Sequence, residues 1–129
     1  MLAIDANVAV RYLVDDDHTQ FLTARRLVES APVFLSSTVM LELEWVLRSA
    51  TVVARSISRS RFELLRGLPR VTLENPRLAA TALDWHERGM DFADAIHLAS
   101  ASGCEAFMTF DRGLANAAAK IEAIPVRAP

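Results

Sequence analysis

Two aspartates lie in a stretch of the sequence that is otherwise typical of a buried helix. Asp91 and Asp94 are one helical turn apart in MDFADAIHLASA (residues 90–101), which contains no lysine or arginine. Burying a carboxylate without a partner costs on the order of several kcal/mol. A carboxylate at the start of a helix caps backbone N–H groups, which explains Asp91. Asp94 shares a helix face with Leu98 and Ala101, and we therefore predict a functional role for it.

Two further aspartates directly follow short apolar segments. Asp5 comes after MLAI, and Asp111 comes after AFMTF. An aspartate in this position commonly belongs to a turn or caps the next helix, and this explains either residue alone. In parallel α/β sheets, however, ligands bind beyond the carboxyl ends of the strands. The fold expected below brings both strand ends to one edge of the sheet, so we expect Asp5 and Asp111 to share a site.

The helix expected over residues 38–50 contains two glutamates, Glu42 and Glu44. At about 100° per residue, Glu42 lies beside an apolar stripe that runs through Leu43. Glu44 points further away and has Arg48 four residues later, which is typical of an exposed ion pair. We therefore expect Glu44 on the surface and Glu42 at the site, with an edge residue that reaches solvent as the alternative for Glu42.

Carboxylates that gather at one place need positive charge, and a divalent cation is the simplest source. A set of oxygen ligands favours Mg²⁺ or Mn²⁺ over zinc. Cys104 is the single cysteine, so the sequence also contains no cysteine cluster for zinc. Such a site lowers the pKa of bound water and holds a phosphate, which suits the hydrolysis of phosphodiesters.

Apolar segments alternate with amphipathic segments from end to end of the sequence. We expect strands at residues 1–4, 32–36, 71–74, 106–110 and 124–126. We expect helices at residues 7–14 (capped by Asn7), 17–30, 38–50, 58–67, 76–89, 91–103 and 111–120. This alternation predicts an α/β fold: a three-layer α/β/α sandwich with a central, mostly parallel sheet of four or five strands. Since we find no linker or repeat, residues 1–129 are expected to form one domain.

Composition and charge set the broad class of the protein. A chain of 129 residues with 52% hydrophobic residues is typical of one globular domain, and its net charge of −2 argues against a broad basic surface. Five arginines lie between residues 55 and 70. They form a solvated helix face or, through Arg59 and Arg61, contact RNA phosphates. No leader peptide and no apolar segment near the ~20 residues of a membrane span are found, so we expect a cytoplasmic protein.

Four motifs, AIDANV, LELEWVLR, MDFADAIHLASA and FMTFDRGL, stand in this order along the chain. Together they resemble the motifs of PIN-domain nucleases, most closely the VapC-type toxins of bacterial toxin–antitoxin pairs. The resemblance implies RNA hydrolysis by a water that Mg²⁺ or Mn²⁺ activates. It also implies a small antitoxin partner and a homodimer.

The resemblance also assigns roles to particular residues. The implied metal ligands, which form the catalytic centre, are Asp5, Glu42, Asp94 and Asp111. This is the set that the chemistry of the residues indicates. The residues implied to support this centre are Asn7 and Thr109, through polar contacts, and Asp91, through water.

Two other classes of function remain open on the sequence. A non-catalytic interaction domain with a PIN-like fold predicts that the acids bind no metal. A phosphoryl-transfer protein of the receiver kind also has an aspartate after its first strand. Such proteins generally need a second acid close to that aspartate and an active-site lysine, whereas DAN (residues 5–7) lacks the acid and Lys120 lies at the far end of a helix.

Overall fold

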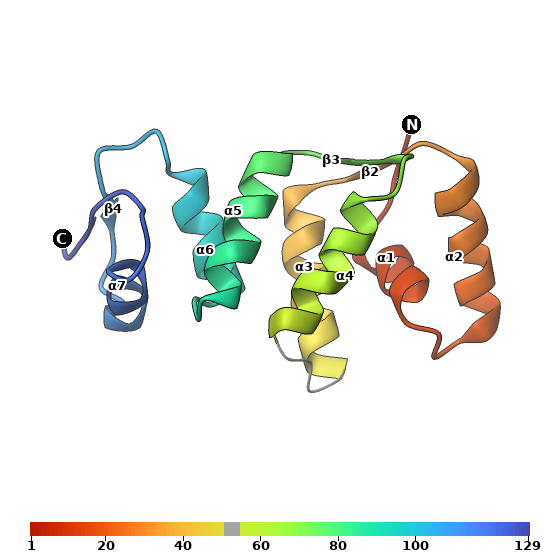
Figure 1. Ribbon diagram of the computed structural model, residues 1–129, viewed down its shortest axis with the longest axis horizontal. Coiled ribbons are helices and arrows are strands. Elements are labelled where there is room, and N and C mark those ends of the chain that lie inside the picture. The colour runs from red at the N-terminus through yellow and green to blue at the C-terminus, as the bar shows by residue number, and fades with distance from the viewer. Residues whose placement is uncertain (51–54) are drawn as a thin grey trace. The chain divides into compact units, whose positions relative to one another are not determined.

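The computed structural model describes residues 1–50 and 55–129. It describes the side chains of residues 1–49 and 59–129. The chain forms two compact units, Met1–Asn75 and Pro76–Pro129. Figure 1 draws both units and labels their helices and some of their strands.

A parallel three-stranded sheet lies in the first unit. In sheet order, its strands are β1 (Leu2–Ala3), β2 (Val33–Leu35) and β3 (Val71–Leu73). Parallel strands need long crossover connections, which are usually helical. The connecting helices are α1 (Ala6–Leu13), α2 (His18–Ser30), α3 (Ser37–Ala50) and α4 (Arg55–Arg66) (Figure 1).

The core of the first unit joins its sheet to its helices. Val33 and Leu35 of β2 are fully buried, as is Leu43 of α3. Helix α1 packs against both α2 and α3, and α4 packs against α3 and β3. Burial of each such aliphatic side chain contributes about 1.5–3 kcal/mol relative to exposure. The packing therefore sets the positions of α3, which contains Glu42, and of the segment after β1, where Asp5 lies.

The second unit contains three helices and a short parallel sheet. Its elements are α5 (Pro76–Glu87), α6 (Phe92–Ser100), β4 (Phe107–Met108), α7 (Arg112–Ala118) and β5 (Val126–Arg127). Strands β4 and β5 are parallel. Helix α5 packs against α6, and the turn between them uses Gly89, whose φ of +112° favours glycine. The His86 Nδ1 atom lies 2.8 Å from the Met90 carbonyl oxygen, and the His86 ring packs edge-on against Phe92.

The structure confirms the predicted α/β class. All five expected strands are present, β1–β3 in one parallel sheet and β4–β5 in another. Two details of the prediction differ from the structure. The described strands form a three-stranded sheet and a two-stranded sheet, not one sheet of four or five strands. Asp5, not Asn7, caps α1, because the helix already begins at Ala6. Within residues 1–50 and 55–129, none of the helices has both the length and the apolar character to cross a membrane.

Candidate functional site

Asp5 and Asp111 occupy equivalent local positions, each between the end of a strand and the start of a helix. Asp5 Oδ1 accepts a hydrogen bond from the Val8 N–H at 3.1 Å, and Asp111 Oδ1 accepts one from the Leu114 N–H at 3.1 Å. Both side chains are exposed. A carboxylate offers about four lone-pair positions, so one capping bond leaves room for a cation. The capping bonds therefore orient both carboxylates and leave lone-pair positions for a cation.

The two glutamates of α3 lie in different environments. Glu42 is exposed, whereas only 2% of Glu44 is exposed. The prediction that Glu44 lies on the surface is therefore wrong. Arg48 Nε does lie 3.3 Å from Glu44 Oε1, so the expected ion pair is present, but its acidic partner is buried. The inward face of α3 consists of Met40, Leu43, Glu44 and Leu47.

Asp94 lies half-buried in the first turn of α6. Burial raises the pKa of its carboxyl group, and the negative charges of Asp91 and Asp111 raise this pKa further, while His97 lowers it. Asp91 caps α6 as predicted, since its Oδ2 accepts a hydrogen bond from the Asp94 N–H at 3.3 Å. The carboxylates of Asp91 and Asp111 thus act electrostatically on that of Asp94. A cation bound among them would relieve this repulsion.

Thr109 and Asn7, both expected to support the acids, differ in their contacts. Thr109 Oγ1 accepts a hydrogen bond from the Asp111 N–H at 3.0 Å, which links it directly to a predicted ligand. Asn7 is exposed on α1. It lines a groove of about 230 Å³ between α1 and α2, together with Val8, Arg11, Gln20, Thr23 and Ala24.

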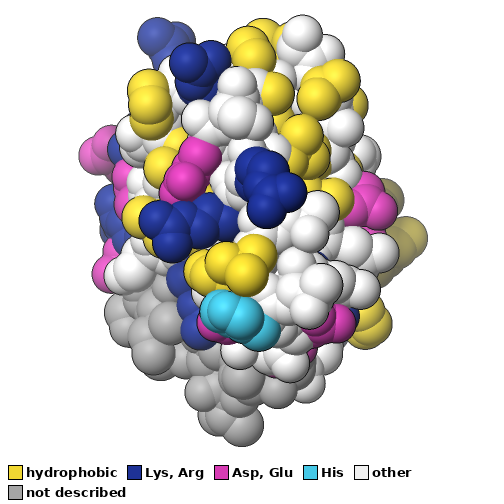
Figure 2. Space-filling model, turned by 90° about the vertical axis from the view of Figure 1, so that its right-hand side faces the viewer, with side chains coloured by type: hydrophobic (Ala, Val, Ile, Leu, Met, Phe, Trp, Pro, Cys, Tyr) yellow, Lys and Arg dark blue, Asp and Glu magenta, His cyan; other side chains and the backbone are white. Residues whose placement is uncertain are grey.

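The arginines considered as RNA contacts, Arg59 and Arg61, are half-buried on α4. The Arg61 Nη1 atom is buried and has no hydrogen-bond partner among the described residues. Nearby, Arg66 pairs with Glu63 at 2.6 Å, and the side chain of Arg55 lies outside the described residues. On the face drawn in Figure 2, basic, acidic and hydrophobic side chains are interspersed. The contact of Arg59 and Arg61 with RNA stays a prediction.

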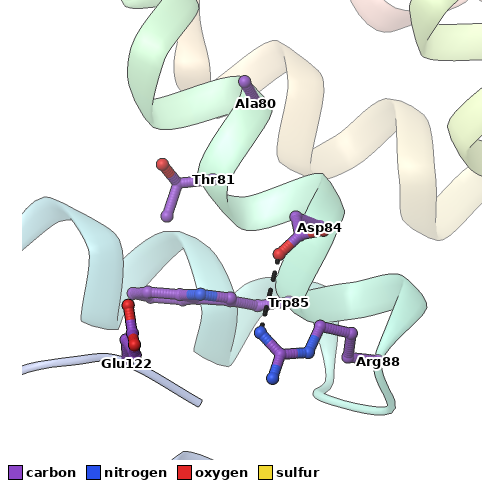
Figure 3. Close-up of a pocket in the computed structure, with 6 residues that line it drawn as sticks. All are labelled: Ala80, Thr81, Asp84, Trp85, Arg88 and Glu122. Carbon is purple, nitrogen blue, oxygen red and sulfur yellow. Dashed lines mark ion pairs between the residues drawn. The ribbon is translucent and has the colours of Figure 1, made fainter.

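A pocket of about 560 Å³ lies in the second unit, and none of the predicted acids lines it. Figure 3 shows its lining residues, with the Glu122 carboxylate beside the Trp85 indole. Asp84 of α5 forms an ion pair at 3.8 Å with Arg88, which directly follows the helix. The charged residues that line the pocket are two acids and one arginine. This combination does not favour the binding of a phosphate.

The chemistry of the predicted acids fits a hard divalent cation, since all four offer carboxylate oxygens. Asp5 and Glu42 lie in the first unit, and Asp94 and Asp111 in the second. In the parts of the chain that the structure describes, no three His, Cys, Asp or Glu side chains form a group that could hold a metal ion. The convergence of the four acids on one cation stays a prediction.

A comparison with protein families identifies a family that this chain matches. The model of the PIN domain matches residues 2–120. This range includes all four predicted acids and spans both units. The match confirms the fold class, a three-layer α/β/α sandwich with parallel strands, and PIN domains are generally metal-dependent nucleases. Among curated proteins, the comparison finds no match.

Proposed function

This chain belongs to the PIN domain family, and we propose that it is a metal-dependent endoribonuclease. The observation that carries the proposal is the position of Asp94, half-buried beside the negative charges of Asp91 and Asp111. Helix capping explains Asp91 and Asp111, but the folded chain gains no stability from the half-buried Asp94 carboxylate beside their negative charges. A bound cation would neutralise these negative charges and help to bind a phosphate substrate.

The residues proposed to hold Mg²⁺ or Mn²⁺ are Asp5, Glu42, Asp94 and Asp111. When bound, this cation supplies a water of lowered pKa and positive charge for the phosphate. The family match, which spans both units, supports the proposal that residues 1–129 act as one nuclease domain.

The chain's own contacts orient these ligands. The capping bonds from Val8 and Leu114 hold Asp5 and Asp111, and Thr109 supports the backbone of Asp111. The Asp91 cap holds the first turn of α6, where Asp94 lies. Preorganised ligands need no rearrangement when the substrate arrives, which favours catalysis. The overall reaction breaks one P–O bond of the RNA backbone and adds the elements of water.

The finer proposal is that the chain is a VapC-type toxin. Its support is the order of the four motifs, from AIDANV to FMTFDRGL. On this proposal the chain acts in the cytoplasm, forms a homodimer and is held inactive by a small antitoxin protein. Sequencing the neighbouring open reading frame tests the partnership, because a toxin gene is expected to adjoin the gene of its antitoxin.

The experiment that tests the ribonuclease proposal compares aspartate-to-asparagine variants in an RNA cleavage assay with Mn²⁺. Asp5→Asn and Asp94→Asn are expected to abolish cleavage. Asp17→Asn is the matched control, because Asp17 also caps a helix, accepting the Gln20 N–H at 3.1 Å, but is not a proposed ligand. Asparagine caps helices about as well as aspartate, so Asp5→Asn and Asp17→Asn keep their helix caps. Asp94 caps no helix, so Asp94→Asn removes no cap. Cleavage by Asp94→Asn at the wild-type rate would contradict the proposal.

A further inference from the structure

Phe110 is the most exposed large hydrophobic side chain among the described residues, with 85% of its surface accessible. It follows β4 and directly precedes Asp111, one of the proposed metal ligands. Single exposed hydrophobic residues are common on protein surfaces. Exposure alone is therefore weak evidence for a binding role of Phe110, and the structure around the residue must be considered.

Hydrogen bonds hold the backbone on both sides of Phe110. The Thr109 N–H donates to the Arg127 carbonyl oxygen at 2.9 Å. The Asp111 N–H donates to Thr109 Oγ1 at 3.0 Å, and the Asp111 carboxylate caps α7. Phe110 is thus exposed to solvent on a backbone segment that hydrogen bonds keep in place. Little side-chain entropy is lost when a rigid aromatic ring on such a segment meets a ligand.

The neighbours of Phe110 in the sequence indicate which ligand this ring fits. Asp111 belongs to the proposed centre that cuts a phosphodiester, and Arg112 presents an exposed guanidinium on the other side of Asp111. Proteins that bind single-stranded nucleic acid combine aromatic rings, on which bases stack, with cations that contact the backbone. An aromatic ring and a cation on the two sides of a proposed metal ligand match this combination.

We infer that Phe110 stacks on one unpaired base of the RNA substrate, next to the bond that is cut. This inference rests on the proposed ribonuclease function. It adds that the substrate is single-stranded at this point, because a base within a duplex has no exposed face to offer. Arg112 contacts the phosphate backbone beside that base.

The test measures RNA binding by Asp94→Asn, in which the RNA stays intact, with and without Phe110→Ala. The probe is a single-stranded RNA series with 2-aminopurine placed at successive positions, whose fluorescence falls when the base stacks. We expect Phe110→Ala to raise the Kd by about 5- to 150-fold and to abolish the quenching. Phe110→Trp restores both. Leu22→Ala, which removes another exposed hydrophobic side chain, on α2, changes neither.

The outcomes separate this inference from the function on which it rests. If the wild-type protein cleaves RNA while Phe110→Ala leaves Kd and quenching unchanged, the inference falls and the ribonuclease stands. A lower melting temperature or a changed oligomeric state for Phe110→Ala, at unchanged RNA affinity, assigns the ring to a protein contact and also overturns the inference. If the wild-type protein neither cleaves nor binds RNA, both proposals fall.

Discussion

The hydroxyl oxygen of Thr109 accepts a hydrogen bond from the backbone N–H of Asp111 at 3.0 Å. This bond fixes the start of α7, where the Asp111 carboxylate caps the helix. Thr109→Val keeps the shape of the side chain but removes the acceptor. Because contacts that orient a ligand typically change metal affinity by about 10- to 100-fold, we expect Mn²⁺ binding to weaken by about 10-fold in this variant.

Thr109→Ser is the control for this prediction, since serine keeps the hydroxyl group. Calorimetric titration of both variants with Mn²⁺ measures the effect. Equal affinities for Thr109→Val and wild type would show that this hydrogen bond does not support a metal ligand.

The two glutamates of α3 allow a matched comparison at a separation of two residues. Glu42 is exposed and proposed as a ligand, whereas Glu44 is 2% exposed and pairs with Arg48 at 3.3 Å. We expect Glu42→Ala to abolish cleavage and to change the free energy of unfolding by no more than about 0.5 kcal/mol. Glu44→Ala loses a buried polar contact and leaves a cavity, so we expect it to lower this free energy by about 1–3 kcal/mol.

Urea unfolding and an RNA cleavage assay, both at 25 °C, measure the two effects. We expect Glu44→Ala to cleave RNA while it remains folded. The reverse result, with stability lost in Glu42→Ala and cleavage lost in Glu44→Ala, would exchange the two assignments.

Helix α3 shows why the sequence predicts which segments form helices and strands better than it predicts which face of a helix is buried. Short apolar runs and helical stretches were sufficient to place all five strands and the seven helices that the structure describes. On α3, however, apolar residues surround most of the helix, so their spacing did not identify the inward face, which contains Met40 and Leu47 besides Glu44. Which face turns inward depends on packing against α1 and α4, which lies outside any local pattern.

The candidate site was predictable to a similar extent. The position of Asp91 as a helix cap and the unusual position of Asp94 followed from the local sequence, and the structure agrees with both. The cap of α1 was assigned to Asn7 because capping residues are recognised by type, and DAN contains two suitable residues. Contacts between residues far apart in the sequence, which a four-acid metal site requires, are set by tertiary packing.

Asp94→Asn is expected to change stability in opposite directions with and without metal. The pKa of Asp94 is raised by burial and by the charges of Asp91 and Asp111, so the folded chain binds this proton more tightly than the unfolded chain does. Above that pKa the ionised carboxylate therefore disfavours folding. At pH 7 without metal, we expect Asp94→Asn to melt at a higher temperature than wild type.

Adding Mn²⁺ is expected to reverse this order, because a cation that binds only the folded wild type stabilises it by about 2.7 kcal/mol at 100 times its Kd. Thermal melts with EDTA and with Mn²⁺ measure the crossing. As the pH falls below the ordinary aspartate pKa, the difference without metal should disappear. A lower melting temperature for Asp94→Asn in EDTA at pH 7 would contradict the proposed repulsion.

Glu74 connects the end of β3 to the start of α3. Its Oε2 accepts a hydrogen bond from the Ser37 N–H at 2.8 Å, and hydrogen bonds from the backbone and side chain of Ser37 lower the pKa of Glu74. A lowered pKa stabilises the fold above the unfolded pKa of glutamate, and this contribution is lost as the pH falls through the folded value. We expect Glu74→Gln to be less stable than wild type at pH 7 and nearly as stable at pH 3.

Urea midpoints at both pH values measure this difference. Glu105→Gln, at an exposed glutamate of the second unit, is the control and should show no such dependence. A Glu74→Gln effect of equal size at pH 7 and pH 3 would show that the charge of Glu74 is not the cause.

The central claim is that Asp5 and Asp94 are ligands of a divalent cation. Calorimetric titration of the full chain with Mn²⁺ tests it most directly, using wild type, Asp5→Asn and Asp94→Asn, with Asp17→Asn as the control. The account predicts Mn²⁺ binding in wild type and Asp17→Asn, and its loss in each of the other two variants. Wild-type affinity in either Asp5→Asn or Asp94→Asn, or no binding in wild type, would contradict the account.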